Sequence, residues 1–485
     1  MQGIDLEAVA AVAILAAATA AFAGSAKPFE LAARRELLVD DRLIEKLEGQ
    51  AGLQLHSPVP AAVALVHDKP WEGNTSAYVT VFRDGRKYRM YYRGWNHAGG
   101  AGDKATHPPV ACYAESEDGV SWVRPALGLF EFEGARDNNI VWTGRGCHNF
   151  APFLDANPDA RPQEKYKALG GVHEEGGIRL FGSADGTRWK ALSDKPVITS
   201  KAFAFDSHNL AFWDTARSEY RVYFRTWPGG RRGISTATSK DMVHWSEPAA
   251  LEYPGAPAEH LYTAQILPYH RAPHLLLGFP ARFIEPRGAL VEGLFMTSRD
   301  GRTFRRWPEA YLRPGPSGDR WGNRSGYIWY GLVETESALP GAGKELSLYA
   351  NEAYYQGGGA RTRRYTCRLD GFVSLHAPMA GGAMQTRPLT FSGSNLLLNV
   401  STSAAGGVRV EVQDADGKPL EGLAAADCTE IYGDSTDRLV RWGARDDLTA
   451  LRGQPVRLRF VLKDADLYAF QFAPAAPPAQ APARR

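Results

Sequence analysis

The chain has 485 residues, too many for one ordinary hydrophobic core, so at least two domains are expected. Its 56 lysines and arginines nearly balance 54 acidic residues, so net charge gives no reason to expect nucleic acid or a membrane surface as a partner. The aromatic content of 11% and the 50 glycines are typical of a β-rich protein with many turns.

The N-terminal region contains an apolar run, residues 8–23, that ends in small residues. The run is short for a membrane span and favours a signal peptide over residues 1–26, hence a secreted or periplasmic protein. Asp5 and Glu7 stand where a signal peptide would carry positive charge, so an ordinary helix is the alternative. Residues 27–70 are expected to form a lead-in segment that brings one strand to the main domain.

The pattern Ser-x-Asp-Gly-x-x-Trp recurs about every 60 residues, starting at Ser116, Ser183, Ser239 and Ser298, with some substitutions. A degenerate fifth copy spans residues 368–374. Glycine supplies positive φ at low cost, so each copy predicts a tight type I′ hairpin turn. Another pair of strand-like runs precedes each copy, and four strands per repeat indicate a propeller blade.

The predicted architecture is all-β: a five-bladed β-propeller over residues 71–378, followed by an antiparallel β-sandwich over residues 379–473. Alternating apolar and polar residues after His376 indicate the sandwich, and a tail rich in proline and alanine, residues 474–485, is expected not to fold. The innermost strands of the five blades are expected at residues 76–82, 149–154, 209–213, 262–267 and 327–333. The four cysteines have no metal-type spacing and are interpreted mainly as core thiols.

Candidate catalytic residues stand where the inner strands begin, because these positions surround the central funnel of a propeller. Three carboxylates occur there, Glu72, Asp206 and Glu259. Glycoside hydrolysis uses one protonated carboxyl group that releases the leaving oxygen and one ionised carboxylate that acts as nucleophile or base. The alternatives are a surface carboxylate for Glu72 and Glu259, and a cap on backbone amides for Asp206.

Three histidines occupy matching places on consecutive blades, His148, His208 and His260. Three imidazoles that converge on one axis could bind a divalent metal, although a single histidine is more often a hydrogen-bonded structural residue. The hydrolytic interpretation requires no cofactor.

Substrate binding is expected from residues near these strand starts and from an arginine that follows the second strand on three blades. Arginine forks bind anionic groups, and tryptophan faces stack on sugar rings. Each of these arginines could instead pair with an acid of a neighbouring blade. The candidates are Trp71, Asn74, Arg93, Trp95, His148, Asn149, His208, Arg225, His260, Tyr262, Arg282, Arg324 and Glu352.

Five blades with this hairpin pattern and a trailing β-domain resemble the five-bladed glycoside hydrolases, which include the invertase and levanase family, the arabinanase and xylosidase family, and the mannoside phosphorylases. The resemblance implies Glu72 as nucleophile or base, Asp206 as stabiliser of the transition state and Glu259 as acid. The Asn-Asp-Pro and Arg-Asp-Pro elements of the invertase family are absent.

The sequence therefore predicts a glycoside hydrolase acting on a furanoside or an anionic glycan. Two alternatives remain open: a metal-dependent polysaccharide lyase that uses the three histidines, and a propeller that binds glycans without cleaving them. A carbohydrate is the expected partner in all three cases.

Overall fold

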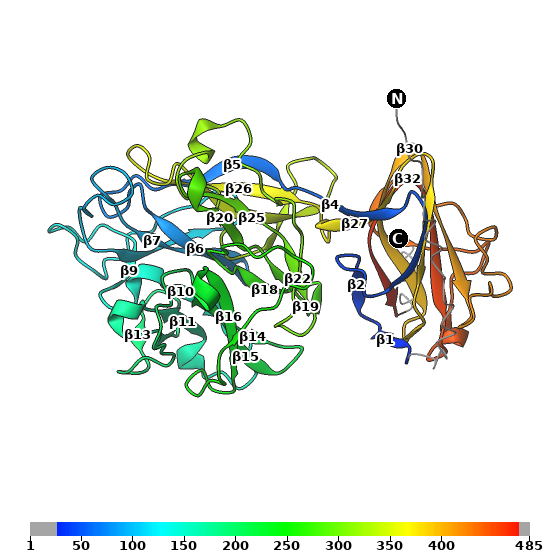
Figure 1. The fold of residues 1–485 in the computed structure, drawn as a ribbon, viewed down its shortest axis with the longest axis horizontal. Helices are drawn as coiled ribbons and strands as arrows, with labels where there is room; N and C mark the ends of the chain where they lie inside the picture. The colour runs from blue at the N-terminus through cyan, green and yellow to red at the C-terminus, as the bar shows by residue number, and fades with distance from the viewer. Residues whose placement is uncertain (1–26, 475–485) are drawn as a thin grey trace, which may run out of the picture.

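The computed structural model describes residues 27–474 and shows two β domains side by side (Figure 1). The predicted signal peptide and nearly all of the predicted tail lie outside the described residues. No helix within residues 27–474 is long and apolar enough to cross a membrane. The four cysteines are free thiols, as expected, and Cys112, Cys147 and Cys428 are buried.

The larger domain is a five-bladed propeller, which confirms the predicted blade count. Five separate four-stranded antiparallel sheets make up the blades, each numbered here from its innermost strand outward. In chain order they are β6(Ala77–Asp84), β7(Lys87–Gly94), β8(Val110–Ser116) and β9(Ile140–Thr143); β10(Ala151–Leu154), β11(Tyr166–Gly170), β12(Arg179–Ser183) and β13(Lys190–Ala191); β14(Leu210–Asp214), β15(Glu219–Thr226), β16(Gly233–Ser239) and β17(Ala249–Ala250); β18(Ile266–Tyr269), β19(Ala272–Gly278), β22(Met296–Ser298) and β23(Arg305–Arg306); and β24(Val333–Glu336), β25(Lys344–Glu352), β26(Arg361–Cys367) and β5(Val59–Val66).

The fifth blade is closed by β5, which comes from the predicted lead-in segment and pairs with β26. This pairing confirms that the segment brings one strand to the ring. An additional hairpin, β20(Ala281–Ile284) and β21(Leu290–Gly293), projects from the fourth blade.

The inner strands agree with prediction in the first three blades but begin later in the last two. Residues 262–265 and 327–331 form the funnel wall instead of a continuous strand. Gln265 has φ 49° and Gly331 has φ 128°, and such left-handed conformations interrupt a regular strand ladder.

The repeated pattern is not the predicted two-residue turn. In the second blade Asp185 Oδ1 accepts hydrogen bonds from the backbone N–H groups of Thr187 and Arg188, both at 2.8 Å. Ser183 Oγ accepts from the N–H of Gly186 at 2.9 Å. A type I′ turn needs positive φ at two residues, whereas here only Gly186 has it, at 81°. The pattern is therefore a side-chain-capped loop between the third and fourth strands.

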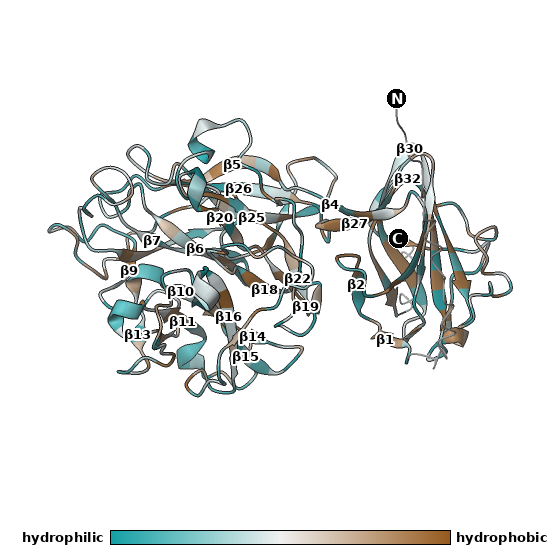
Figure 2. Cartoon of the chain, viewed as in Figure 1, coloured by the Kyte–Doolittle hydropathy of each residue, from teal (hydrophilic) through white to brown (hydrophobic). Residues whose placement is uncertain are grey.

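The smaller domain is an eight-stranded sheet bent around its own hydrophobic core. Its strands come from both ends of the described chain: β2(Arg35–Leu37), β3(Ile44–Gly49), β4(Gly52–Leu55), β27(Val373–Ala377), β28(Gly382–Thr386), β30(Asn395–Gln413), β31(Asp434–Leu439) and β32(Arg457–Ala473). A parallel pair, β1(Phe29–Ala32) and β29(Leu389–Phe391), adds to it. Figure 2 shows hydrophobic residues concentrated on strands and hydrophilic residues on many of the connecting loops.

The boundary between the domains differs from the predicted one in two respects. Most of the lead-in segment, β1 to β4, belongs to the smaller domain, and β27 does too, although it was expected inside the propeller. Both differences arise from pairing between residues hundreds of positions apart, such as Leu37 with Ala469.

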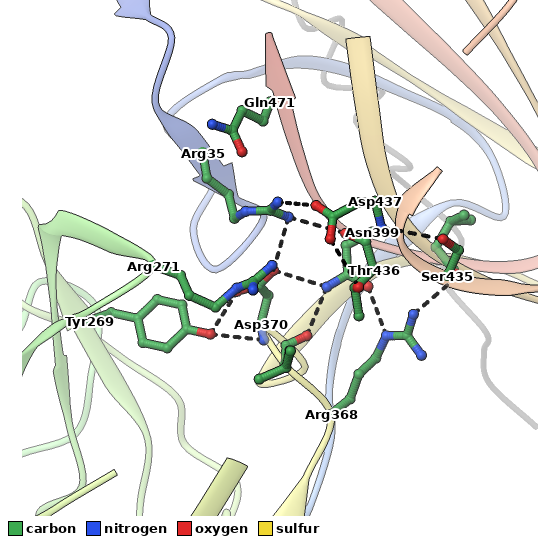
Figure 3. Close-up of polar contacts among 12 residues, drawn as sticks. Arg35, Tyr269, Arg271, Arg368, Asp370, Asn399, Ser435, Thr436, Asp437 and Gln471 are labelled. Atoms are coloured by element: carbon green, nitrogen blue, oxygen red, sulfur yellow. Dashed lines mark hydrogen bonds and ion pairs between the residues drawn. The ribbon is translucent and has the colours of Figure 1, made fainter. Parts of the chain in front are cut away.

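A buried carboxylate joins the two domains (Figure 3). Asp370, in the degenerate fifth copy of the pattern, accepts hydrogen bonds from Tyr269 at 2.6 Å and Arg271 at 2.9 Å, both in the fourth blade. Arg35 and Asn399 of the smaller domain donate to its other oxygen at 3.2 and 2.9 Å. The last copy of the repeat therefore serves as a joint between the domains.

Candidate active-site funnel

Side chains from all five blades meet in a closed ring of contacts where the inner strands begin. Tyr78 of the first blade lies 5.9 Å from the His148 ring and 5.5 Å from the His208 ring, measured between centroids. Tyr262 of the fourth blade lies 5.4 Å from Tyr327 of the fifth. We call this region the funnel.

Asp206 is the predicted catalytic carboxylate that lies in the funnel. Its side chain is 39% exposed, and its Oδ2 accepts a hydrogen bond from Arg225 Nη2 at 3.2 Å. Its Oδ1 lies 3.8 Å from His148 Nε2. Partial burial would raise its pKa, but the charges of Arg225 and Arg93 hold the pKa of Asp206 well below its usual range. The carboxylate is therefore ionised at neutral pH.

The backbone before Asp206 is held in a strained conformation. Phe205 is fully buried and has φ 71°, unusual for a bulky residue. The side-chain amides of Asn149 and Asn209 donate to its carbonyl oxygen at 3.0 and 2.8 Å. Asn149, predicted to bind substrate, is thus a buried clamp that positions Asp206.

Glu72 lies outside the funnel, in a buried ion pair between the first and fifth blades. Arg124 Nε is 2.9 Å from its Oε1, and Tyr92 donates to the same oxygen at 2.5 Å. Burial raises the pKa of Glu72, although the charge of Arg124 opposes the shift. The side chain is only 1% exposed and cannot reach a substrate in the funnel.

Glu259 and Glu352 are likewise held by arginines. Arg282 Nε lies 2.8 Å from Glu259 Oε1, and Arg306 binds its other oxygen. Arg363 donates to Glu352 at 2.6 Å within the fifth blade. In the part of the chain that the structure describes, Glu72, Asp206 and Glu259 share no hydrogen-bond or ion-pair partner. Each of the three predicted catalytic carboxylates therefore has its own arginine partner.

The three histidines do not form a metal site. His208 is buried beneath the funnel, where Gln265 donates to its Nδ1 at 3.2 Å, and burial lowers its pKa to about 3. His260 lies at the rim, 3.4 Å from Arg232. Among residues 27–474 no group of three or more His, Cys, Asp and Glu side chains is placed to hold a metal ion.

His148 contributes a neutral imidazole to the funnel. Arg93 Nη1 lies 3.1 Å from its Nε2, which acts as acceptor if the proton is on Nδ1. Burial, reinforced by the charge of Arg93, lowers the pKa of His148. A neutral imidazole beside an ionised carboxylate can accept or relay a proton.

Arginine and aromatic side chains line the rest of the funnel. The Arg93 guanidinium lies 4.6 Å from the Tyr78 ring and 4.7 Å from Trp95, and it donates to the Tyr354 hydroxyl at 2.7 Å. Arg225 lies 4.1 Å from the Tyr262 ring. Of the predicted binding residues, the funnel therefore contains Arg93, Trp95, His148, Arg225, His260, Tyr262 and Arg324.

Three other predicted binding residues have structural roles elsewhere. Trp71 donates to Asn139 at 2.7 Å, away from the funnel contacts. Asn74 is buried and its amide donates to the carbonyls of His97 and Gly99. Arg282 binds Glu292 as well as Glu259.

Tyr78, Arg232 and Tyr327 are wall residues that the sequence pattern did not predict. Tyr78 lies inside the expected first strand, where alternation gave no sign that its φ of 53° would turn it toward His148. Arg232 comes from the loop between β15 and β16, which follows no repeat. The aromatic residues clustered near 327 and 354 are the one signal that could have located this wall.

No protein-family model matches the sequence, and no curated protein matches it at a significant level. Solved structures with a similar fold include an N-acetylgalactosamine deacetylase from F. plautii bound to blood group B trisaccharide, with 15% identity, 66% of this chain and 94% of that chain covered, and a TM-score of 0.43. Another is the catalytic domain of a GH62 α-L-arabinofuranosidase from Coprinopsis cinerea, with 7% identity, 65% of this chain and 99% of that chain covered, and a TM-score of 0.42. A third is an endo-arabinase from Bacteroides thetaiotaomicron, with 12% identity, 65% of this chain and 98% of that chain covered, and a TM-score of 0.39.

Proposed function

We propose that this protein is a glycoside hydrolase that cleaves its substrate at Asp206 in the propeller funnel. One observation carries the proposal: of the three predicted catalytic carboxylates, Asp206 is ionised, partly exposed and close to His148 of the neighbouring blade. Trp95 lies 5.3 Å from the His148 ring and Trp227 lies 5.7 Å from the Arg225 guanidinium, and an indole face is suited to stacking on a sugar ring.

The ionised state of Asp206 defines its role in hydrolysis. The carboxylate either takes a proton from water or attacks the anomeric carbon; the glycosidic C–O bond breaks, the leaving oxygen gains a proton, and water supplies the new hydroxyl. Two groups of the funnel can carry a proton: His148, 3.8 Å from Asp206, and Tyr354, whose hydroxyl accepts a hydrogen bond from Arg93. Burial raises the pKa of Tyr354 to about 12, so its phenol retains its proton at neutral pH.

The test is the Asp206→Asn variant, assayed for sugar release on a broad panel of oligosaccharides and polysaccharides. Loss of a catalytic base or nucleophile should lower the rate by about 1,000-fold or more. Glu259→Gln is the matched control, because it also removes one carboxylate charge but affects an ion pair outside the funnel. Full activity in Asp206→Asn would contradict the assignment, and binding of glycans by an inert wild-type protein would favour a purely binding function.

A second candidate is β-elimination without a metal, favoured by the neutral His148 beside Arg93. In this reaction a base removes the proton at C5 of a uronate, the C4–O bond breaks, a C4–C5 double bond forms, and the leaving oxygen takes up a proton. A lyase would release a product that absorbs in the near ultraviolet, whereas a hydrolase would not. The same substrate panel therefore separates the two reactions.

A further inference from the structure

Four arginines surround the funnel at short range. The guanidinium carbons of Arg225, Arg232 and Arg324 lie 4.1, 5.7 and 5.9 Å from the centre of the Tyr262 ring. Arg93 approaches from the side of Tyr78. They come from the first, third and fifth blades and from the loop before β16, so only the closed ring of blades brings them together.

Few acids oppose this positive charge. Asp206 pairs with Arg225 at 3.2 Å, and the exposed Glu285 lies 3.9 Å from Arg232. The other polar partners of these arginines within residues 27–474 are neutral: the Thr75 and Asp206 carbonyls, the imidazoles of His148 and His260, and the phenols of Tyr354 and Tyr355. By contrast, Arg282 and Arg306, outside the funnel, each bind a carboxylate.

The arginines also repel one another. Burial, followed by the charge of Arg225 and, more weakly, that of Arg324, lowers the pKa of Arg232. Like charges held together in a partly buried site disfavour the empty state and favour a bound anion.

Arg225 provides an independent sign of a missing partner. It is 2% exposed, yet its Nη1 makes no hydrogen bond. Within residues 27–474 it is the only buried guanidinium Nη atom in that condition. A buried donor without an acceptor is costly, and a ligand oxygen would satisfy it.

We propose that the sugar bound in the funnel carries an anionic group, a carboxylate or a sulfate ester, that lies against Arg225, Arg232 and Arg324. This inference rests on the proposed function and narrows its substrate class to acidic glycans. Arg232 and Arg324 are partly exposed and give the anion access, while Arg225 forms the base of its site.

The test measures binding to the full chain by calorimetry, with glucuronate, glucose 6-sulfate and glucose as probes at low ionic strength. At least one charged probe should bind about 10-fold more tightly than glucose, and added salt should reduce the difference. The tighter of the two charged probes identifies the group as carboxylate or sulfate. Equal binding of all three, or no binding of either charged probe in the millimolar range, overturns the proposal.

Arg324→Gln should remove most of this preference, about a 10-fold loss for the charged probe with little change for glucose. Arg313→Gln is the matched control, because Arg313 is exposed and its side chain has no hydrogen-bond or ion-pair partner among residues 27–474. Arg232→Gln provides a second test if Arg324→Gln folds poorly. Unchanged preference in both folded variants contradicts the assignment.

The outcome is separable from that of the proposed function. Preference for the charged probe without any cleavage would support the anion site and contradict the hydrolase. Cleavage of neutral glycans that depends on Asp206, without any preference for the charged probes, would support the hydrolase and contradict the anion site.

Discussion

At the scale of single residues, the difference between Asp206 and Glu72 is one of direction. Both stand just before an inner strand, and both carry a carboxylate that chemistry could use. Asp206 pairs with Arg225 of its own blade beside His148 of the neighbouring blade, whereas Glu72 pairs with Arg124 and Tyr92. Position along the chain could not distinguish them, because the orientation of each side chain depends on partners from distant segments.

Glu72→Gln should therefore lower stability without lowering activity per folded molecule. The variant leaves the mostly buried Arg124 with only the exposed Asp68 as counter-charge, at a cost of about 2 to 3 kcal/mol. Urea unfolding measures the loss, and Glu117→Gln, an exposed acid, serves as control. Normal stability together with lost activity would restore Glu72 as a catalytic residue.

At the scale of elements, the repeated loop is a docking device between blades. Tyr91 of the first blade donates to the Gly186 carbonyl of the second blade at 2.8 Å, and Tyr223 of the third donates to Gly301 of the fourth at 2.8 Å. Tyr349 of the fifth donates to Gly119 of the first at 2.5 Å. The recurring pattern thus reflects both a local loop and its contact with a neighbouring blade.

Gly186→Ala should disrupt this contact. The residue has φ 81°, and an added Cβ would lie 2.8 Å from Arg89 Nη1 and Tyr91 Oη. Gly85→Ala is the matched control, because Gly85 has φ 62° but open space around it. We expect thermal unfolding to show a loss of about 1 kcal/mol for Gly85→Ala and clearly more for Gly186→Ala. Equal losses of stability would mean that the positive φ alone causes the effect and that the contact between the blades contributes nothing.

At the scale of the whole molecule, buried acids hold the two domains together. Glu36 of β2 in the smaller domain binds His274 at 3.1 Å and Arg299 at 3.0 Å, both in the fourth blade. Burial alone would raise its pKa, but the close contact with His274 and the charge of Arg299 lower the pKa of Glu36 to about 2. Asp370 has a lowered pKa too, despite its burial, chiefly because of Arg271 and Arg35.

The junction should therefore weaken in acid. A carboxylate with a lowered folded pKa stabilises the fold above its unfolded pKa, near 4.5 for Glu36, and this stability is lost as the pH falls toward 2. The shift of Glu36 corresponds to about 3 kcal/mol. The free energy of unfolding, measured from pH 7 to pH 2, should decline less steeply for Glu36→Gln than for the wild-type protein.

Glu48→Gln is the control for this experiment. The pKa of Glu48 is also lowered to about 2, by hydrogen bonds from Arg459 and Lys46, but the pair lies at the surface. Solvent screening should make its contribution small. A larger effect for Glu48→Gln than for Glu36→Gln would contradict the proposed role of the junction.

The sequence by itself determined the five blades, because each depends on short-range hydrogen bonds within a loop and on alternating residues in neighbouring strands. It also placed Arg93, Arg225 and Arg324 near the ends of strands that face the centre. Only the tertiary structure decided that these arginines share one funnel with Asp206, that Glu72 and Glu259 are neutralised elsewhere, and that the first strands complete the distant sheet. Those outcomes depend on contacts between residues tens to hundreds of positions apart, whose partners no local pattern specifies.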